Sequence, residues 1–256
     1  MSPASMTPEP VGEGVVSIRV ASDEAPYIEA DFKDRFAGAV DALKADASVK
    51  VALLEGGSRY FCAGASRESL LRADARSEVP RYAAELPRLV LDIPVPTIAV
   101  MEGHAIGGGF ALGLLCDLPL LAEESLYGMN FMALGFTPGM GATGLLEEAL
   151  GPRPARELLF TGRLVKGREL RALGACGVLP RADVRRRALA LAAELGAVPR
   201  EPLLRLKGML AGRRRDGLQR AIEEETRSHE VLFALGDTAR CIAERYSGSL
   251  LGEPEP

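Results

Sequence analysis

The chain has 256 residues, of which 47% are hydrophobic and 26% charged, and its formal net charge at pH 7 is −4. This length can bury a substantial core as one large domain or two small ones. The acidic balance excludes a general attraction to nucleic acid or anionic membranes, and no apolar run reaches the length of a membrane span.

The N-terminus and the cysteines indicate the compartment. Residues 1–14 are rich in Pro, Ser, Gly and Glu and lack the apolar core of a signal peptide, so we expect a flexible leader. Four scattered cysteines favour thiols in a reducing compartment over a disulfide framework or a metal cage: Cys62, Cys116, Cys176 and Cys241. Because only two histidines are present, no histidine-based metal site is expected. We therefore predict a cytoplasmic protein without a bound metal.

Strands alternate with helices in the first part of the chain, and helices alone follow. Apolar, β-prone runs predict strands at 15–21, 26–29, 49–55, 93–101 and 118–122. Helical spacing of apolar residues predicts helices at 31–46, 68–92 with a break near 77–80, 110–116, 155–160, 166–173, 182–195, 202–211, 217–235 and 237–247. Residues 129–144 have too much glycine for a helix and too few polar residues for a solvent loop, so we expect them to line a site. This order predicts an α/β core with a helical C-terminal extension.

The most informative segment is Glu102–Ala111, in which three consecutive glycines stand between a buried strand and a helix. Such a turn leaves backbone N–H groups bare at the positive end of a helix dipole, a place that suits an oxygen that becomes negative during a reaction. A second strand is followed by the turn Tyr60–Ser66, which also bends at a small residue. Two such turns can supply two N–H donors to one carbonyl oxygen.

Two other interpretations of the glycines stand beside an oxyanion site. Phosphate binding is disfavoured, because the segment lacks the Gly-x-Gly-x-x-Gly spacing and has no Lys-Ser/Thr ending. Taken alone, the triple glycine fits a plain tight turn as well as it fits an oxyanion site. The second strand and turn favour the oxyanion site.

These residues resemble the crotonase (enoyl-CoA hydratase/isomerase) superfamily from about residue 15 to residue 246. The segments that carry the resemblance are Phe61–Ala65, Pro96–Val100, Gly103–Gly109, Cys116–Asp117, Gly135–Thr143 and Leu158–Arg163. The resemblance implies an α/β fold in which residues 15–195 form a spiral of ββα turns. It also implies a helical region over 196–256 that builds trimers, often paired into hexamers. In such proteins two backbone N–H groups hold a thioester carbonyl, and by position these belong to Ala65 and Gly108.

Two catalytic glutamates of the superfamily's hydratases have no counterpart here. By alignment to the turns, the first position is Ala111 and the second is Phe131, and neither residue can move a proton. Glu102, Glu123 and Glu124 are near in sequence but lie on the wrong side of the turns. We therefore do not expect hydration, nor isomerisation by a glutamate at the second position.

A short window is apolar instead, with Met129, Phe131, Met132 and Phe136. Methionine and phenylalanine are usually core residues, but the resemblance implies that this window faces the acyl group. An apolar pocket disfavours a carboxylate more than the carbon dioxide and delocalised enolate that it becomes, so it promotes decarboxylation.

The segments Asn130–Met132 and Gly135–Thr143 are similar to the decarboxylating crotonases of polyketide β-branching cassettes. This narrower resemblance implies a 3-methylglutaconyl group carried on the phosphopantetheine of an acyl carrier protein. It implies a 3-methylcrotonyl-type product and no further cofactor. The alternative is isomerisation or hydrolysis of a coenzyme A thioester.

Two further residues are candidates for the chemistry. His229 matches the place where these decarboxylases carry a histidine, which can attract the carboxylate and later give a proton. Without the resemblance we would prefer a surface histidine at this position, and we expect His104 to be structural. Arg72 is the candidate to bind the substrate carboxylate, with Arg67 as its neighbour, in a helix where some relatives have a lysine.

Two basic clusters, Arg185–Arg187 and Arg213–Arg215 with Lys207, contrast with the acidic chain. Such runs are usually solvated helix faces, but either cluster can meet an acidic carrier protein or the phosphates of coenzyme A. A protein of another class, an inactive assembly subunit or a nucleic-acid binder, is disfavoured by the net acidity and the two glycine turns.

Overall fold

Residues 6–246 are described in a computed structural model, in which ten strands form two sheets. The large sheet has the order β1 (Glu9–Gly12), β2 (Val15–Arg19), β3 (Val51–Glu55), β5 (Thr97–Met101), β7 (Leu118–Ala122) and β10 (Val178–Leu179). The small sheet has the order β4 (Tyr60–Cys62), β6 (His104–Ile106), β8 (Leu126–Gly128) and β9 (Val165–Lys166). Neighbouring strands run parallel, except that β1–β2 and β8–β9 are antiparallel.

The helices follow the strands in chain order and then continue alone. They are α1 (Phe32–Ala45), α2 (Arg67–Leu71), α3 (Ala75–Leu91), α4 (Gly108–Leu115), the 3-10 helix η1 (Met132–Leu134), α5 (Ala142–Leu150), α6 (Pro152–Thr161), α7 (Gly167–Ala172), α8 (Arg181–Gly196), α9 (Arg200–Leu232) and α10 (Gly236–Arg245). The predicted α/β fold with a helical C-terminal region is confirmed.

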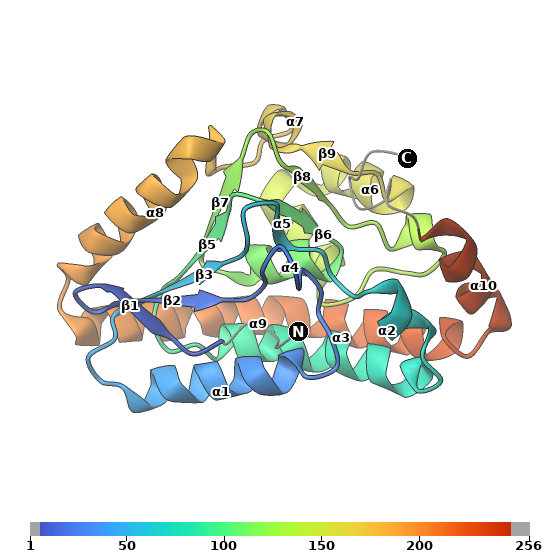
Figure 1. Cartoon of the computed structure of the whole chain (residues 1–256), viewed down its shortest axis with the longest axis horizontal. Coiled ribbons are helices and arrows are strands. Elements are labelled where there is room, and N and C mark those ends of the chain that lie inside the picture. Colours follow the sequence, from blue (N-terminus) through green and yellow to red (C-terminus); the bar gives the residue numbers. More distant parts are fainter. Residues whose placement is uncertain (1–5, 247–256) are drawn as a thin grey trace.

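Helices cover both faces of the large sheet, so its central strands are apolar on both sides. In β3, Val51 and Leu53 pack toward α8, whereas Ala52 and Leu54 belong to the main core together with residues of α1. Figure 1 shows α8 on one side of the sheet and the layer of α1, α3 and α9 on the other. This packing explains why the strands read as continuous hydrophobic runs.

The small sheet places the two glycine turns at one edge. Strands β4 and β6 pair in parallel with Tyr60 opposite His104 and Cys62 opposite Ala105. Because parallel strands end at the same edge of a sheet, the segments that follow them meet there. The loop after β4 and the first turn of α4 are therefore neighbours.

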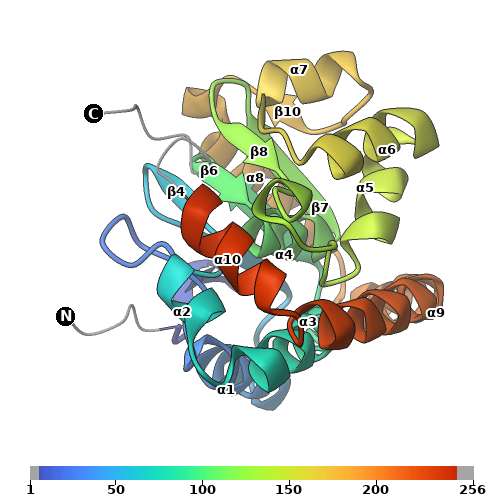
Figure 2. The same ribbon diagram turned by 90° about the vertical axis from the view of Figure 1, so that its right-hand side faces the viewer.

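The C-terminal helices return to this edge. Helix α9 packs along α3 and also contacts α5, while α10 lies on α2 and η1 (Figure 2). Two arginines connect the C-terminal helices to α2 and α3. The Arg67 guanidinium donates to Ala243 O at 3.1 Å, and the Arg76 guanidinium donates to Ala234 O at 2.9 Å. Within residues 6–246, none of the helices is both long and apolar enough to cross a membrane.

The N-terminal half departs from the predicted elements in three places. Residues 9–12, inside the segment 1–14 expected as a flexible leader, pair with β2 as an edge strand; residues 1–5 lie outside the described part. The expected strand 26–29 is reduced to one bridge between Ile28 and Ala65. The helix break expected near 77–80 lies at 72–74 instead, because α3 runs through Pro80, which costs one main-chain donor but is buried.

The two helices expected at 202–211 and 217–235 are one helix, α9. Gly212 and Gly217 lower its intrinsic helix propensity, but Ala211 and Leu218 on either side of them are buried. Tertiary packing of α9 on α3 and α5 thus stabilises a continuous helix in spite of the two glycines. The domain boundary expected between residues 195 and 196 stays a prediction.

Candidate active site

A cavity of ≈ 140 Å³ lies between the two glycine turns, α3 and the C-terminal helices. Six of the residues predicted for the site line it: Ala65, Arg72, Gly108, Phe131, Phe136 and His229. They come from segments far apart in the chain, which the fold brings to one place. The segment 129–144, expected to line a site, supplies much of the wall.

The two turns touch through their backbones. Gly64 adopts φ +76, and a Cβ placed on it would lie 2.7 Å from Ile106 O and 3.2 Å from Gly108 N. A Cβ on Gly109 would lie only 2.0 Å from Cys62 O. Glycine is required at both places because any side chain would push the turns apart.

The predicted oxyanion donors, the amides of Ala65 and Gly108, both belong to residues that line the cavity. Gly108 opens α4, so its N–H has no acceptor within the helix. Ile28 and Ala65 form a parallel β-bridge, in which the Ile28 N–H donates to Gly64 O at 2.8 Å. In a bridge of this kind Ile28 bonds to the residues beside Ala65, so the N–H of Ala65 itself points away from Ile28. The Ala65 carbonyl accepts from the Tyr246 hydroxyl at 2.8 Å, which further fixes this peptide.

His229 reaches the cavity from α9 and is 1% exposed, so the surface histidine considered for this position is excluded. Its Nε2 lies 2.8 Å from Thr137 O. A carbonyl oxygen only accepts, so Nε2 carries the hydrogen, and Nδ1 is the unprotonated nitrogen of the neutral ring. Nδ1 is buried and has no hydrogen-bond partner in the described part of the chain.

Burial lowers the pKa of His229 below its usual value, although the Thr137 and Pro138 carbonyls oppose this shift. The ring is packed edge-on against Phe136, with centroids 5.7 Å apart, and against Phe233 at 5.6 Å. These aromatic neighbours offer no charge to stabilise an imidazolium. The free protein therefore holds His229 neutral near pH 7.

The lowered pKa of His229 predicts an acid-sensitive stability. The unfolded ring, with a pKa of about 6.5, binds a proton more readily than the folded one, so stability is present above that pH and lost as the pH falls below it. We expect the free energy of unfolding of the wild type to decline in this window and that of His229→Gln to decline less. Denaturant unfolding at a series of pH values measures this difference. Parallel curves for the two proteins would contradict it.

The apolar wall is only partly the one that the sequence predicts. Phe131 and Phe136 line the cavity, with ring centroids 5.7 Å apart. Met129 and Met132 are not among the lining residues, so the structure does not bring them to the cavity with Phe131 and Phe136, and their contact with an acyl group stays a prediction. Met129 directly follows β8 and is fully buried in the core, whereas Met132 begins η1 and is 38% exposed.

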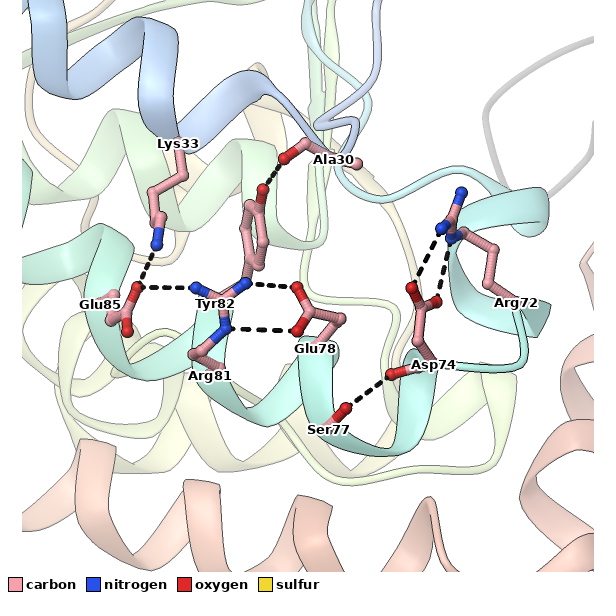
Figure 3. Close-up of polar contacts among 9 residues, drawn as sticks. All are labelled: Ala30, Lys33, Arg72, Asp74, Ser77, Glu78, Arg81, Tyr82 and Glu85. Atoms are coloured by element: carbon pink, nitrogen blue, oxygen red, sulfur yellow. Dashed lines mark hydrogen bonds and ion pairs between the residues drawn. The ribbon is translucent and has the colours of Figure 1, made fainter.

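Arg72 lines the cavity but already has a carboxylate partner. Figure 3 shows its guanidinium facing Asp74 across the gap between α2 and α3, with Nε and Nη2 each 3.0 Å from a carboxylate oxygen. This pair raises the pKa of Arg72 and lowers that of Asp74. Arg67 does not line the cavity and instead bonds to Ala243 O.

The polar or flexible wall residues that sequence reasoning missed include Tyr82, Asn130, Met140 and Tyr246. The Tyr82 hydroxyl donates to Ala30 O, and Figure 3 shows its ring among the ion pairs of Arg81, Glu78, Lys33 and Glu85. No short motif marks these residues. Only Asn130 and Met140 lie in segments that the sequence singles out.

The basic clusters are largely neutralised within the chain. Arg185, Arg186 and Arg187 pair with Glu55, Asp183 and Glu194. Arg214 pairs with Glu148 and donates to carbonyls at the end of α4, and Arg215 pairs with Asp92. Lys207 is buried on Asp117. These contacts favour the structural interpretation of both clusters.

Comparison with known proteins agrees with this geometry. Residues 12–244 match the sequence model of the enoyl-CoA hydratase/isomerase family. The chain is 40% identical over 205 residues to the bacillaene synthase decarboxylase PksI of Bacillus subtilis (strain 168), covering 79% of this chain and 82% of that protein. It is also 37% identical over 140 residues to human mitochondrial methylglutaconyl-CoA hydratase, covering 53% of this chain and 41% of the hydratase.

Solved structures give the same result. A protein of a dehydratase/decarboxylase enzyme couple involved in polyketide beta-branching superimposes with a TM-score of 0.86 at 32% identity, covering 95% of this chain and 100% of that one. The ECH2 decarboxylase domain of CurF from Lyngbya majuscula superimposes with a TM-score of 0.83 at 30% identity, covering 94% and 99% of the two chains.

Proposed function

Because the chain belongs to the enoyl-CoA hydratase/isomerase family, we propose that it is a lyase that decarboxylates an acyl thioester in polyketide β-branching. The proposed substrate is a 3-methylglutaconyl-type group on the phosphopantetheine of an acyl carrier protein. The proposed product is a 3-methylcrotonyl-type thioester.

The observation that carries this proposal is the chemistry of the cavity wall. Two backbone turns can hold a thioester oxygen, yet the two positions at which hydratases have glutamates are Ala111 and Phe131. The carboxylates that do line the cavity, Glu29, Asp74 and Glu78, are exposed or half-buried. His229 is the fully buried titratable group of the lining. Such a wall can stabilise an enolate and deliver one proton, but it has no buried carboxylate to activate water.

The reaction then needs one bond to break and one to form. The bond to the distal carboxyl carbon breaks, carbon dioxide leaves, and the bonding electrons pass into a dienolate. Its oxygen lies between the amides of Ala65 and Gly108, where each donor is worth about 3 kcal/mol in a dry site. The ring of His229 must first gain a proton at Nδ1, because its Nε2–H is held by Thr137. That proton then adds to a carbon of the dienolate.

Arg72 is the proposed partner of the substrate carboxylate and must leave Asp74 to act. Since the Arg72 side chain is exposed to water, solvent and salt screen an ion pair there, and such a pair contributes little to binding. We therefore expect Arg72→Ala to raise KM by no more than about fivefold while kcat changes little. Steady-state rates of carbon dioxide release measure both constants. A kcat lowered by orders of magnitude would show instead that Arg72 acts on the breaking bond.

The proposed function is tested by mass spectrometry of a carrier-bound 3-methylglutaconyl thioester after incubation with the protein. The expected result is loss of carbon dioxide under single-turnover conditions. An unchanged acyl group would reject the proposal. A shifted double bond or a released acid would replace it with isomerisation or hydrolysis, tested in parallel on the coenzyme A thioester.

A homotrimer or hexamer is the proposed assembly. It is supported by large apolar side chains that α9 leaves exposed: Leu206 (51%), Met209 (58%) and Leu210 (48%). An acyl carrier protein is the proposed partner, and it must approach the cavity to deliver its acyl group. Contact with Arg213–Arg215 is not part of this proposal, because two of these arginines are paired within the chain.

A further inference from the structure

The loop Thr137–Gly141, which supplies Gly139 and Met140 to the cavity wall, is held at both ends by α9; we call it the strap. At its first residue, Thr137 O accepts from His229. At its last residue, Gly141 N–H donates to Glu225 Oε2 at 2.7 Å. Glu225 and His229 are four residues apart, so they lie one turn apart on the same face of the helix.

Glu225 is 5% exposed and makes further contacts beyond the strap. Its Oε1 accepts from Thr143 N–H at 2.9 Å and from the Thr143 hydroxyl at 2.7 Å. Burial raises the pKa of this carboxyl, while the hydrogen bonds from Thr143, Gly141 and Ala142 oppose the shift. Both oxygens of this buried carboxyl group thus accept hydrogen bonds from the end of the strap and the start of α5.

The strap carries two residues of the cavity wall. Met140 is held at φ +65, a left-handed conformation that side chains other than glycine rarely adopt, and its Sδ would lie 2.9 Å from a Cβ on Gly108. Gly139 packs so closely on the imidazole that a Cβ there would lie 2.5 Å from His229 Cε1. The strap therefore touches both the proposed oxyanion donor and the proposed proton donor.

We propose that Glu225 is a positioning residue, which fixes the strap so that Thr137 O holds His229 in its Nε2–H form and Met140 stays against Gly108. The catalytic part of this inference rests on the proposed decarboxylation. Release of the Gly141 end frees the strained Met140 and lets the Thr137 carbonyl move. Nε2–H then loses its acceptor, and the ring is no longer confined to one tautomer.

The test compares Glu225→Gln with Glu224→Gln, the same change on the exposed side of α9. The new carboxamide can still accept from Thr143, but its NH₂ faces the Gly141 N–H, where two donors cannot pair. We expect kcat to fall about 10²-fold, the cost typical of a displacement of about 1 Å, with a smaller change in KM. Glu224→Gln should leave both constants as in the wild type.

The tautomer of His229 is an independent measurement, made by ¹H–¹⁵N correlation of the imidazole nitrogens. The chain has only two histidines, and His104 is an internal reference because its Nδ1 accepts from Leu126 N–H at 3.0 Å. In the wild type both rings should be Nε2–H. In Glu225→Gln, His229 should show a mixture of tautomers while His104 is unchanged.

Thr143→Val provides a milder variant in case Glu225→Gln does not fold. It removes only the hydrogen bond from the Thr143 hydroxyl to Glu225 and keeps the Thr143 N–H. We therefore expect a smaller fall in kcat and a smaller fraction of the second His229 tautomer than in Glu225→Gln. If folded variants kept the wild-type tautomer and kcat and lost only thermal stability, Glu225 would be structural and the inference wrong. The tautomer of His229 can be measured even if the wild type does not decarboxylate the substrate. The positioning role of Glu225 and the proposed decarboxylation can therefore be rejected independently.

Discussion

Replacing His229 with alanine is expected to lower kcat for carbon dioxide release by about 10²–10⁴-fold, the range lost when a positioned proton donor is removed. The amides of Ala65 and Gly108 remain in place in this variant, so the acyl thioester should still bind. Single-turnover mass spectrometry of the carrier-bound acyl group measures the rate directly. A rate equal to that of the wild type would move the proton donor elsewhere, while leaving the reaction itself established.

Two glutamine variants make this result specific. His229→Gln keeps a donor for Thr137 O but cannot transfer a proton, so its kcat should be as low as that of the alanine variant. His104→Gln removes the other imidazole and keeps an acceptor for Leu126 N–H, and its kcat should stay near that of the wild type. Equal losses in the two glutamine variants would indicate a general effect on folding.

The pH profile follows from the same ring. A donor must carry its proton, and burial lowers the pKa of His229, so kcat/KM of the wild type should fall as the pH rises. This limb should disappear from the residual activity of His229→Gln. Persistence of the limb in that variant would assign it to another group.

Gly109→Ala is expected to abolish most activity without touching a catalytic side chain. The new Cβ would stand 2.0 Å from Cys62 O and 2.6 Å from Cys62 C, both backbone atoms that cannot rotate away. The turns must separate, and the loss of even one oxyanion donor costs about 10²–10³-fold in kcat. Strain of this kind should also lower the free energy of unfolding by about 3 kcal/mol. Turnover and denaturant unfolding measure the two effects.

Gly38→Ala is the matched control, because it makes the same change in the middle of α1 with no atom within 4 Å of the new Cβ. It should raise the free energy of unfolding by about 0.5–1 kcal/mol, since alanine loses less conformational freedom than glycine in a helix. Wild-type activity in Gly109→Ala would contradict the close contact of the two turns.

The sequence predicts the turns of this site better than its walls. Consecutive glycines between a strand and a helix are a local pattern, and parallel pairing then brings Gly64 and Gly108 together without further information. The family resemblance adds His229, whose burial no local pattern indicates. The charged sequence Arg227–Glu230 predicts an exposed stretch of helix, and only the packing of α9 on α3 and α5 shows that His229 is buried.

The differences between the predicted and the observed cavity wall have a common physical cause. Met129 and Met132 are as apolar as Phe131, but a single residue of offset in an irregular segment sends one side chain into the core and another toward solvent. Arg72 lines the cavity, but its pairing with Asp74 depends on the turn of the chain between α2 and α3, which no sequence pattern indicates. The composition of segment 129–144 predicts that it lines a site, but its backbone geometry decides which of its side chains reach the cavity.

The two proposed amide donors and two of the rings that line the cavity come from segments far apart in the chain. Ala65 and Gly108 are synthesised first, whereas His229 lies in the last turn of α9 and Tyr246 directly follows α10. The cavity is therefore completed only after the chain has left the ribosome as far as Tyr246. A prematurely terminated chain that ends before α9 would retain both glycine turns and yet lack the proposed proton donor and part of the cavity wall.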